Sequence, residues 1–233
     1  MTEPADIVFL IDVDNTLLDN DQVIEDLHTH IEAELGAERA ASYWTGLEAL
    51  RDELGYVDYL GAIQRLRNTS SPAAMSDPRL LRIGRYMVDY PFADRLYPGA
   101  LLALQKLRER GKTVIVSDGD VVFQPRKIEH SGLWGAVDGK VLIYVHKEQM
   151  LEAIAVLHPA RHYVMIDDKL RILSAMKAIW GDRLTTVFVR QGHYALDLEA
   201  IAGYTPADIT IERIGDLATP ASPASALFSE DTP

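Results

Sequence analysis

The first strand-like segment of the chain ends in two carboxylates, and this arrangement constrains the fold more than any other feature. The apolar run 7–11 predicts a strand buried on both faces, as in a parallel sheet. Asp12 and Asp14 follow at i and i+2, so their side chains are expected on one side, about 6.6 Å apart. Paired acids repel each other and are costly to bury unless a cation or a substrate uses them. The sequence therefore predicts a site at the carboxyl edge of an open α/β sheet.

The composition excludes several classes of function. Lys and Arg number 23 against 35 Asp and Glu, and this net charge of −12 argues against binding to nucleic acid or to anionic membranes. The absence of cysteine excludes disulfides, thiolate catalysis and zinc–thiolate sites. The N-terminus has no basic region, and Asp12 interrupts its apolar run, so neither a signal peptide nor a membrane span is indicated. We expect a cytoplasmic enzyme.

The chain divides into a helical insertion and an alternating part. Apolar residues at helical spacing predict helices at 21–35, 38–54, 58–66 and 78–90, with a loop at 68–72 and no convincing strand. From residue 100 onward, helices and strands alternate, which indicates right-handed crossovers and a parallel sheet. Strands are expected at 113–116, 137–145, 162–166, 186–189 and 208–211, and helices at 100–110, 121–130, 147–157 and 170–180. The predicted domains are an α/β core at 1–18 and 95–218, a helical insertion at 19–94, and a disordered tail rich in Pro, Ala and Ser at 219–233.

Polar residues follow several of the other expected core strands. Ser117, Asp118 and Gly119 come after one strand, Lys147 opens the helix after the next, and the pair 167–168, Asp-Asp, follows a third. Taken singly, the serine and the acids could be helix N-caps and the lysine a solvated surface residue. Because carboxyl ends of parallel strands share one edge of a sheet, their joint placement favours a site there.

Together these residues resemble the four motifs of the haloacid dehalogenase superfamily. The resemblance lies in Asp12-Val13-Asp14-Asn15-Thr16-Leu17, Ser117, Lys147 and Asp167-Asp168, which occur in the family's order and span nearly the whole chain. It implies an α/β fold with a Rossmann-like parallel sheet core, and the helical insertion looks like the family's small C1-type cap. Tyr97-Pro98-Gly99 is also typical of capped phosphatase members.

The resemblance assigns catalytic roles. Asp12 would be the nucleophile that forms an aspartyl phosphate, and Asp14 would protonate the leaving alcohol and then deprotonate the attacking water. Ser117 would donate a hydrogen bond to a phosphoryl oxygen. Lys147 would pair with both Asp12 and the phosphoryl group, which reduces the repulsion between two anions.

The resemblance also implies substrate and metal ligands. The backbone N–H groups around Ser117, at Asp118 and Gly119, would help to bind the phosphoryl group. Mg²⁺ would be held by Asp12, the backbone carbonyl of Asp14, and Asp168, with Asp167 as a further ligand or as a partner of a ligand. Hard oxygen ligands of this kind suit Mg²⁺.

Two details depart from the family pattern. The family's lysine is often followed by proline, whereas Glu148 follows Lys147 here, and the preceding His146 could compete for the role. We interpret His146 as a surface histidine at a strand end. The last motif has adjacent acids, Asp167 and Asp168, which leaves open how the two share the metal.

The leading hypothesis is a Mg²⁺-dependent phosphatase that acts on a small phosphorylated metabolite. Haloacid dehalogenases lack the second motif acid, so Asp14 argues against that reaction. Phosphonatases use a cap lysine, and the first lysine here is Lys106, after the helical insertion. Phosphomutases of the β-phosphoglucomutase type share every core motif and are the main alternative. A phospho-acceptor domain of the receiver type would carry its acid pair first rather than late, and it would have no helical insertion.

Overall fold

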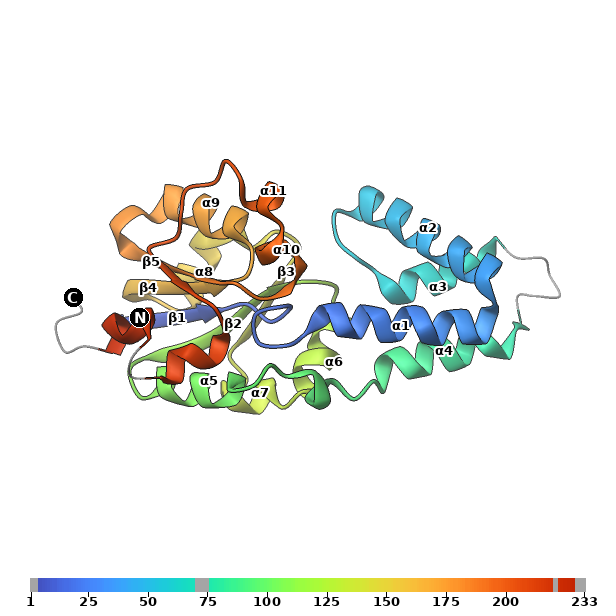
Figure 1. Cartoon of the computed structure of the whole chain (residues 1–233), viewed down its shortest axis with the longest axis horizontal. Helices are drawn as coiled ribbons and strands as arrows, with labels where there is room; N and C mark the ends of the chain where they lie inside the picture. Colours follow the sequence, from blue (N-terminus) through green and yellow to red (C-terminus); the bar gives the residue numbers. More distant parts are fainter. Residues whose placement is uncertain (1–3, 70–75, 220–221, 229–233) are drawn as a thin grey trace.

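The core of the protein is a six-stranded parallel sheet with the strand order β3-β2-β1-β4-β5-β6 (Figure 1). The computed structural model describes residues 4–69, 76–219 and 222–228. The strands are β1 (Ala5–Ile11), β2 (Lys112–Asp118), β3 (Val141–Tyr144), β4 (Ala160–Asp167), β5 (Leu184–Val189) and β6 (Ile209–Ile211). The predicted fold class is confirmed.

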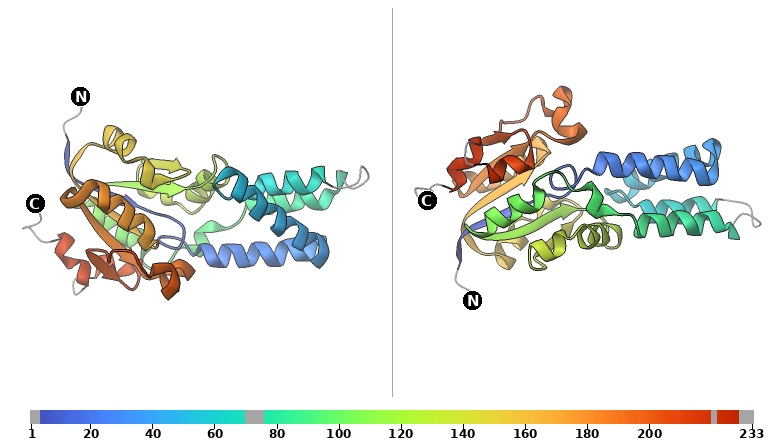
Figure 2. Two further views of the ribbon diagram at one scale, coloured as in Figure 1. Left: turned by 90° about the horizontal axis from the view of Figure 1, so that it is seen from above. Right: turned by 60° about the horizontal axis from the view of Figure 1, so that its bottom comes forward.

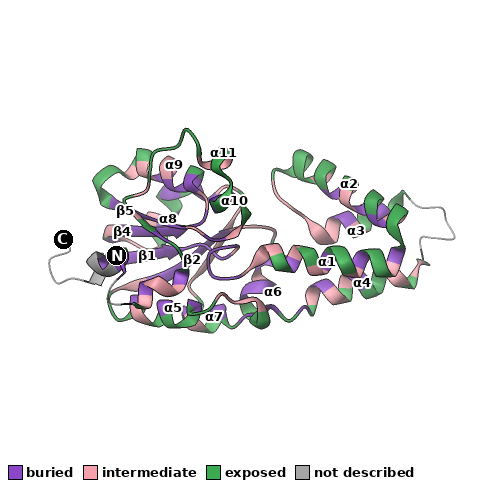
Figure 3. Cartoon of the chain, viewed as in Figure 1, coloured by how far each residue is buried: buried purple, intermediate pink, exposed green. Residues whose placement is uncertain are grey.

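The central strand β1 is buried on both faces, as its sequence predicts. Phe9 and Ile11 point into one hydrophobic layer, which also contains α5, α6 and α7. Val8 and Leu10 point into a second layer, which contains α8 and α9. Figure 3 shows the strands buried beneath these two helical layers. The covering helices are α5 (Ala100–Arg108), α6 (Phe123–His130), α7 (Leu133–Ala136), α8 (Leu151–Leu157), α9 (Leu170–Trp180), α10 (Gly192–Leu196) and α11 (Leu198–Ile201).

An all-helical cap is inserted between β1 and α5. It consists of α1 (Asn20–Leu35), α2 (Ala37–Leu54), α3 (Tyr59–Asn68) and α4 (Pro78–Val88). Helix α1 packs against α2 and α4, and α3 packs against the same two helices. Figure 2 shows the cap projecting from the side of the core toward which β1 runs.

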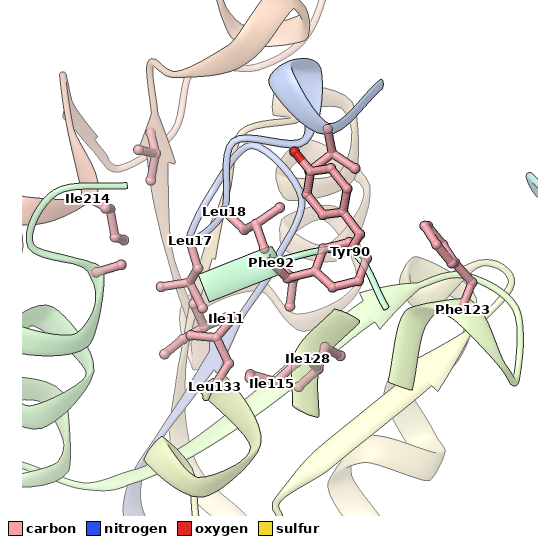
Figure 4. Packing of buried hydrophobic residues seen from close by; sticks show 14 of the residues in the cluster. Ile11, Leu17, Leu18, Tyr90, Phe92, Ile115, Phe123, Ile128, Leu133 and Ile214 are labelled. Atoms are coloured by element: carbon pink, nitrogen blue, oxygen red, sulfur yellow. The ribbon is translucent and has the colours of Figure 1, made fainter. Parts of the chain in front are cut away.

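The chain leaves and re-enters the core through two segments that lie side by side. Asp19 donates its backbone N–H to the Arg95 carbonyl at 2.8 Å, and Tyr97 donates to the Leu17 carbonyl at 3.0 Å. Figure 4 shows Leu17 and Leu18 packed with Phe92 from the short helix η2 (Phe92–Arg95) at this junction. The predicted domain boundaries at 18 and 95 fall at this crossing, and the division itself stays a prediction.

Two of the expected elements are much shorter than predicted. The strand expected at 137–145 covers only Val141–Tyr144, because Asp138 and Gly139 have positive φ angles and form a turn before it. The helix expected at 147–157 is a single 3₁₀ turn, η3 (Lys147–Gln149), followed by α8. Among the described helices, none combines the length and the apolar character that a bilayer crossing requires.

The predicted disordered tail is wrong for residues 222–228. After the 3₁₀ helix η5 (Ile214–Ala218), these residues form η6 (Pro223–Phe228), whose Ala224 and Leu227 are buried in the layer that contains α5. Apolar residues within the Pro- and Ala-rich stretch thus provide enough contact to order it. The remainder of the predicted tail, 220–221 and 229–233, lies outside the described residues, as do residues 70–72 of the expected loop.

Candidate active site

The carboxylate of Asp12 and the ammonium of Lys147 form a buried pair at the carboxyl edge of the sheet. Asp12 follows β1, and its backbone N–H donates to the carbonyl of Ile166 in β4 at 3.0 Å. Lys147 Nζ donates to Asp12 Oδ1, lies 2.7 Å from Asp167 Oδ2 and donates to the Val116 carbonyl at 3.3 Å. Burial alone would lower the pKa of Lys147, but the Asp12 and Asp167 carboxylates outweigh it and raise that pKa. The lysine is therefore held charged between two acids.

Three acids at this edge could hold a metal ion. Carboxylate oxygens of Asp12, Asp167 and Asp168 lie within 4.8 Å of one another, and all three residues are buried. Both Asp168 oxygens are without a hydrogen-bond partner among the described residues, whereas Asp167 Oδ1 accepts the Lys169 backbone N–H at 2.8 Å. Burial raises the pKa of Asp168, and the charges of Asp167 and Asp12 raise it further. A divalent cation would relieve this repulsion, so the three carboxylates fit Mg²⁺. Asp168 would be its most available ligand, because neither of its oxygens accepts a hydrogen bond from a described residue.

The second predicted acid, Asp14, is engaged by a different set of residues. Lys127 Nζ donates to Asp14 Oδ1 at 2.7 Å and to Asn20 Oδ1 at 2.8 Å, and Gln124 Nε2 donates to Asp14 Oδ2 at 3.4 Å. Lys127 is only 1% exposed. Asp12 and Asp14 are thus chemically distinct, because one faces the acidic cluster and the other faces two donors from α6.

The predicted phosphoryl-binding residues lie at the end of β2, beside β1. Ser117 is buried, and its Oγ accepts a hydrogen bond from Gln124 Nε2 at 2.9 Å. Burial raises the pKa of Asp118 to about 6, although Lys147 opposes the shift through its charge and through its backbone N–H, which donates to Asp118 Oδ1 at 2.8 Å. The N–H of Gly119 donates to the Tyr144 carbonyl at 2.9 Å. No larger residue fits at position 119 without moving Gln124, because a Cβ there would lie 2.7 Å from the Gln124 side chain.

Three site residues were missed by the sequence reasoning. Thr16 Oγ1 donates to Asp12 Oδ2 at 3.3 Å and accepts the Asp168 backbone N–H at 3.1 Å, so it links the first and last motifs. Lys127 and Gln124 are the other two. A signal was present for Lys127, because it lies four residues after buried Phe123 and so falls on the apolar face of α6. Lys147, rather than His146, reaches Asp12.

A cleft of about 650 Å³ opens above these residues, between cap and core. Arg51 at the end of α2 and Tyr194 in α10 both line it. The ammonium of Lys169 lies in the same cleft, 4.9 Å from the centre of the Tyr194 ring. Burial alone would lower the pKa of Lys169, but the carboxylates of Asp12, Asp168 and Asp167 raise it. A bound molecule would therefore contact both domains.

Comparisons with known proteins agree with this geometry. Residues 8–179 match the family model of the haloacid dehalogenase-like hydrolases. A haloacid dehalogenase-like hydrolase from Burkholderia xenovorans LB400 is 61% identical, with a TM-score of 0.86 over 92% of this chain and 96% of that chain. None of the curated proteins matches the sequence.

Two more distant structures share the fold alone. The HAD-hydrolase YfnB from Bacillus subtilis, solved with magnesium bound, is 17% identical, with a TM-score of 0.55 over 91% of this chain and 96% of that chain. The L-2-haloacid dehalogenase PA0810 is 16% identical, with a TM-score of 0.61 over 91% of this chain and 98% of that chain. The family model covers most of the sequence. The chain therefore belongs to the haloacid dehalogenase-like hydrolases.

Proposed function

We propose that the protein is a Mg²⁺-dependent phosphatase that hydrolyses a small phosphorylated metabolite through an aspartyl phosphate on Asp12. The observation that carries the proposal is a buried cluster: Lys147 contacts the Asp12 carboxylate, and an oxygen of Asp168, which has no hydrogen-bond partner among the described residues, lies within 4.8 Å of an oxygen of Asp12. Phosphoryl transfer depends mainly on positioning and on neutralising charge, and this cluster offers both.

The proposed reaction has two steps. An Asp12 carboxylate oxygen attacks phosphorus, the bond to the alcohol oxygen breaks, and Asp14 delivers a proton to that oxygen. Water then attacks the phosphorus of the aspartyl phosphate, Asp14 takes its proton, and the Asp12–phosphorus bond breaks to release inorganic phosphate. Ser117 would donate a hydrogen bond to a phosphoryl oxygen. When bound by Asp12, the Asp14 carbonyl and Asp168, Mg²⁺ would neutralise phosphoryl charge.

Asp14 is what separates this proposal from dehalogenation. A halide leaving group needs no proton, so a dehalogenase would have no use for a second acid at this position. Here Asp14 lines the cleft and is held by two side chains of α6. A phosphomutase would use the same residues and is the second candidate. In that case the phosphoryl group would appear on another position of the substrate instead of being released.

The test is a screen of phosphorylated metabolites with Mg²⁺, with phosphate release as the readout. Asp12→Asn should reduce kcat by at least about 10⁴-fold, because the nucleophile is lost. Asp6→Asn, at an exposed position of the same strand, serves as the matched control and should keep full activity. EDTA should inactivate the enzyme, and Mg²⁺ should restore it. Undiminished phosphate release by Asp12→Asn would contradict the proposal.

A further inference from the structure

The hydroxyl of Ser117 can donate to a phosphoryl oxygen only if its hydrogen is not taken up by the protein. A serine hydroxyl carries one donor hydrogen and two acceptor lone pairs, and the hydrogen rotates to suit its neighbours. Ser117 is 1% exposed. The carbonyl of the preceding residue, Val116, lies 3.3 Å from Lys147 Nζ, and the same ammonium contacts Asp12. The serine is thus held beside the proposed nucleophile, and its partners decide where its hydrogen points.

The side chain of Gln124 occupies the acceptor side of this hydroxyl. Its Nε2 donates to Ser117 Oγ at 2.9 Å, and both side chains are buried. The hydroxyl hydrogen has an acceptor in the Asp118 carbonyl, but this oxygen is 3.5 Å away, beyond the usual length of such a bond. Because Gln124 meets the hydroxyl with a donor, it does not take up the hydroxyl hydrogen. That hydrogen is therefore available to a stronger acceptor, such as a phosphoryl oxygen.

The carboxylate of Asp14 favours the orientation in which the Gln124 amide donates. Gln124 Nε2 donates to Asp14 Oδ2 at 3.4 Å as well as to Ser117. If the amide were turned round, its carbonyl oxygen would face the carboxylate, and the two negative groups would repel each other. The same carbonyl would also accept the Ser117 hydrogen and withdraw it from a substrate. The charge of Asp14 thus disfavours the arrangement that would silence Ser117.

We propose that Gln124 is a positioning residue that makes Ser117 a hydrogen-bond donor to the phosphoryl group. The ligand class is a phosphate monoester or inorganic phosphate. This inference rests on the proposed function and adds a connection to it: Asp14 orients the amide of Gln124, and the amide orients the hydroxyl of Ser117. The acid that serves the leaving group is therefore coupled to the donor that serves the phosphoryl oxygens.

A double-mutant cycle on Gln124 and Ser117 tests the proposal. Gln124→Met replaces the amide with an apolar side chain of similar length and should lower kcat/KM by about 5- to 10-fold, the value of one hydrogen bond. The loss should be equal for an alkyl phosphate and p-nitrophenyl phosphate, because the phosphoryl oxygens are the same in both. In Ser117→Ala, which has no hydroxyl to orient, adding Gln124→Met should change kcat/KM by less than about 2-fold. Gln105→Met, at an exposed position of α5, is the control and should leave kcat/KM unchanged.

Three results would overturn the proposal. A loss that persists in full in the Ser117→Ala background would show that Gln124 acts through packing, because a merely structural role does not depend on the hydroxyl. A loss that is clearly larger for the alkyl phosphate than for p-nitrophenyl phosphate would show that Gln124 acts through Asp14 and the leaving group. Wild-type kcat/KM in Gln124→Met would show that the amide is not needed.

Binding of inorganic phosphate separates this proposal from failure of the proposed function. In a calorimetric titration of the whole protein with Mg²⁺ present, Gln124→Met should weaken phosphate binding by about 5-fold or more, and it should have little effect in Ser117→Ala. This coupling in a protein that hydrolyses no phosphate ester would confirm the role of Gln124 and refute the phosphatase. Asp12-dependent hydrolysis with independent effects of the two substitutions would leave the phosphatase intact and refute the role of Gln124.

Discussion

The carboxyl edge of the sheet and the helical cap differ in the burial of their charged side chains. At the sheet edge, Asp12, Lys147 and Asp168 are buried, and the Asp168 carboxylate has no hydrogen-bond partner among the described residues. In the cap, charges lie in exposed pairs such as Arg82–Glu34, with Nη2 and Oε2 2.7 Å apart. Surface pairs contribute little to stability, whereas buried charges cost several kcal/mol each. Among the described residues, most buried charged side chains lie at this edge of the sheet.

The cap has the interior of an ordinary helical bundle. Leu27, Ile31 and Leu47 are among its buried residues, and His28 stacks on Trp44 with ring centroids 3.6 Å apart. Among its charged groups, Asp21 of α1 reaches the core, where its Oδ1 lies 2.6 Å from Nδ1 of His193 in α10, and Arg51 lines the cleft. Under the proposed function, the sheet edge supplies the chemistry, while the cap lines the cleft. Three substitutions, at the edge, at the junction and in the cap, test that division.

The largest effect is expected at the sheet edge. Asp168→Asn removes the freest carboxylate of the acidic cluster, so Mg²⁺ affinity and activity should fall by about 100-fold or more. Asp182→Asn, on the exposed turn after α9, is the control and should leave both unchanged. Mg²⁺ titration and phosphate release measure the effect. Wild-type Mg²⁺ affinity in Asp168→Asn would show that the cluster does not hold the metal.

The same variant makes a prediction about pH. The pKa of Asp168 is raised in the folded state, so the fold binds its proton more tightly than the unfolded chain does. In metal-free protein this residue therefore lowers the free energy of unfolding at neutral pH, and the cost disappears as the pH falls below about 4. In EDTA, Asp168→Asn should be more stable than the wild type in urea at pH 7, and the difference should shrink toward pH 4.

An intermediate effect is expected at the junction between the two regions. Lys127 connects Asp14 to Asn20, the first residue of the cap helix α1. Lys127→Met should lower kcat/KM by about 10- to 100-fold for an alkyl phosphate, because a misplaced Asp14 delivers its proton poorly. The loss should be smaller for p-nitrophenyl phosphate, whose leaving group needs little protonation.

Equal losses for the two substrates would show that Lys127 supports the structure rather than the proton transfer. Lys140→Met is the matched control, because Lys140 pairs with exposed Asp138 at 3.0 Å and does not line the cleft. It should leave both rates unchanged.

The smallest effect is expected in the cap. Arg51→Met removes one charged side chain from the cap side of the cleft, so kcat/KM for the best metabolite should fall by only about 3- to 10-fold. Turnover of p-nitrophenyl phosphate should change less, because the chemistry lies elsewhere. Arg85→Met, on the exposed face of α4, is the control. A loss of kcat/KM as large as that of Asp168→Asn would contradict the view that the chemistry resides at the sheet edge and not in the cap.

The sequence predicted the fold and the main acids because their signals are local. A strand buried on both faces is a short apolar run, and the acids that end β1 and β4 follow such runs directly. The helices of the cap were also predictable, because their apolar residues recur at helical spacing. The lengths of β3 and η3 were not, because a turn at Asp138 and a 3₁₀ turn at Lys147 depend on backbone geometry.

The parts of the site that the sequence did not reveal depend on tertiary contacts. The helical spacing places Lys127 on the apolar face of α6, but only the fold shows that Asp14 and Asn20 surround its ammonium. In the sequence, Thr16 is an ordinary loop residue. Its role depends on the fold, which places the Asp168 N–H, at the end of β4, within hydrogen-bond distance of its hydroxyl.

The central claim is that Asp12 accepts the phosphoryl group, and acid-quenched mass spectrometry tests it most directly. The protein is mixed with Mg²⁺ and a substrate that it hydrolyses, quenched within the first turnover and digested. The account predicts one added phosphoryl group on the peptide that contains Asp12, and none in Asp12→Asn. A phosphoryl group on another residue, or none on the protein while the substrate is consumed, would contradict it.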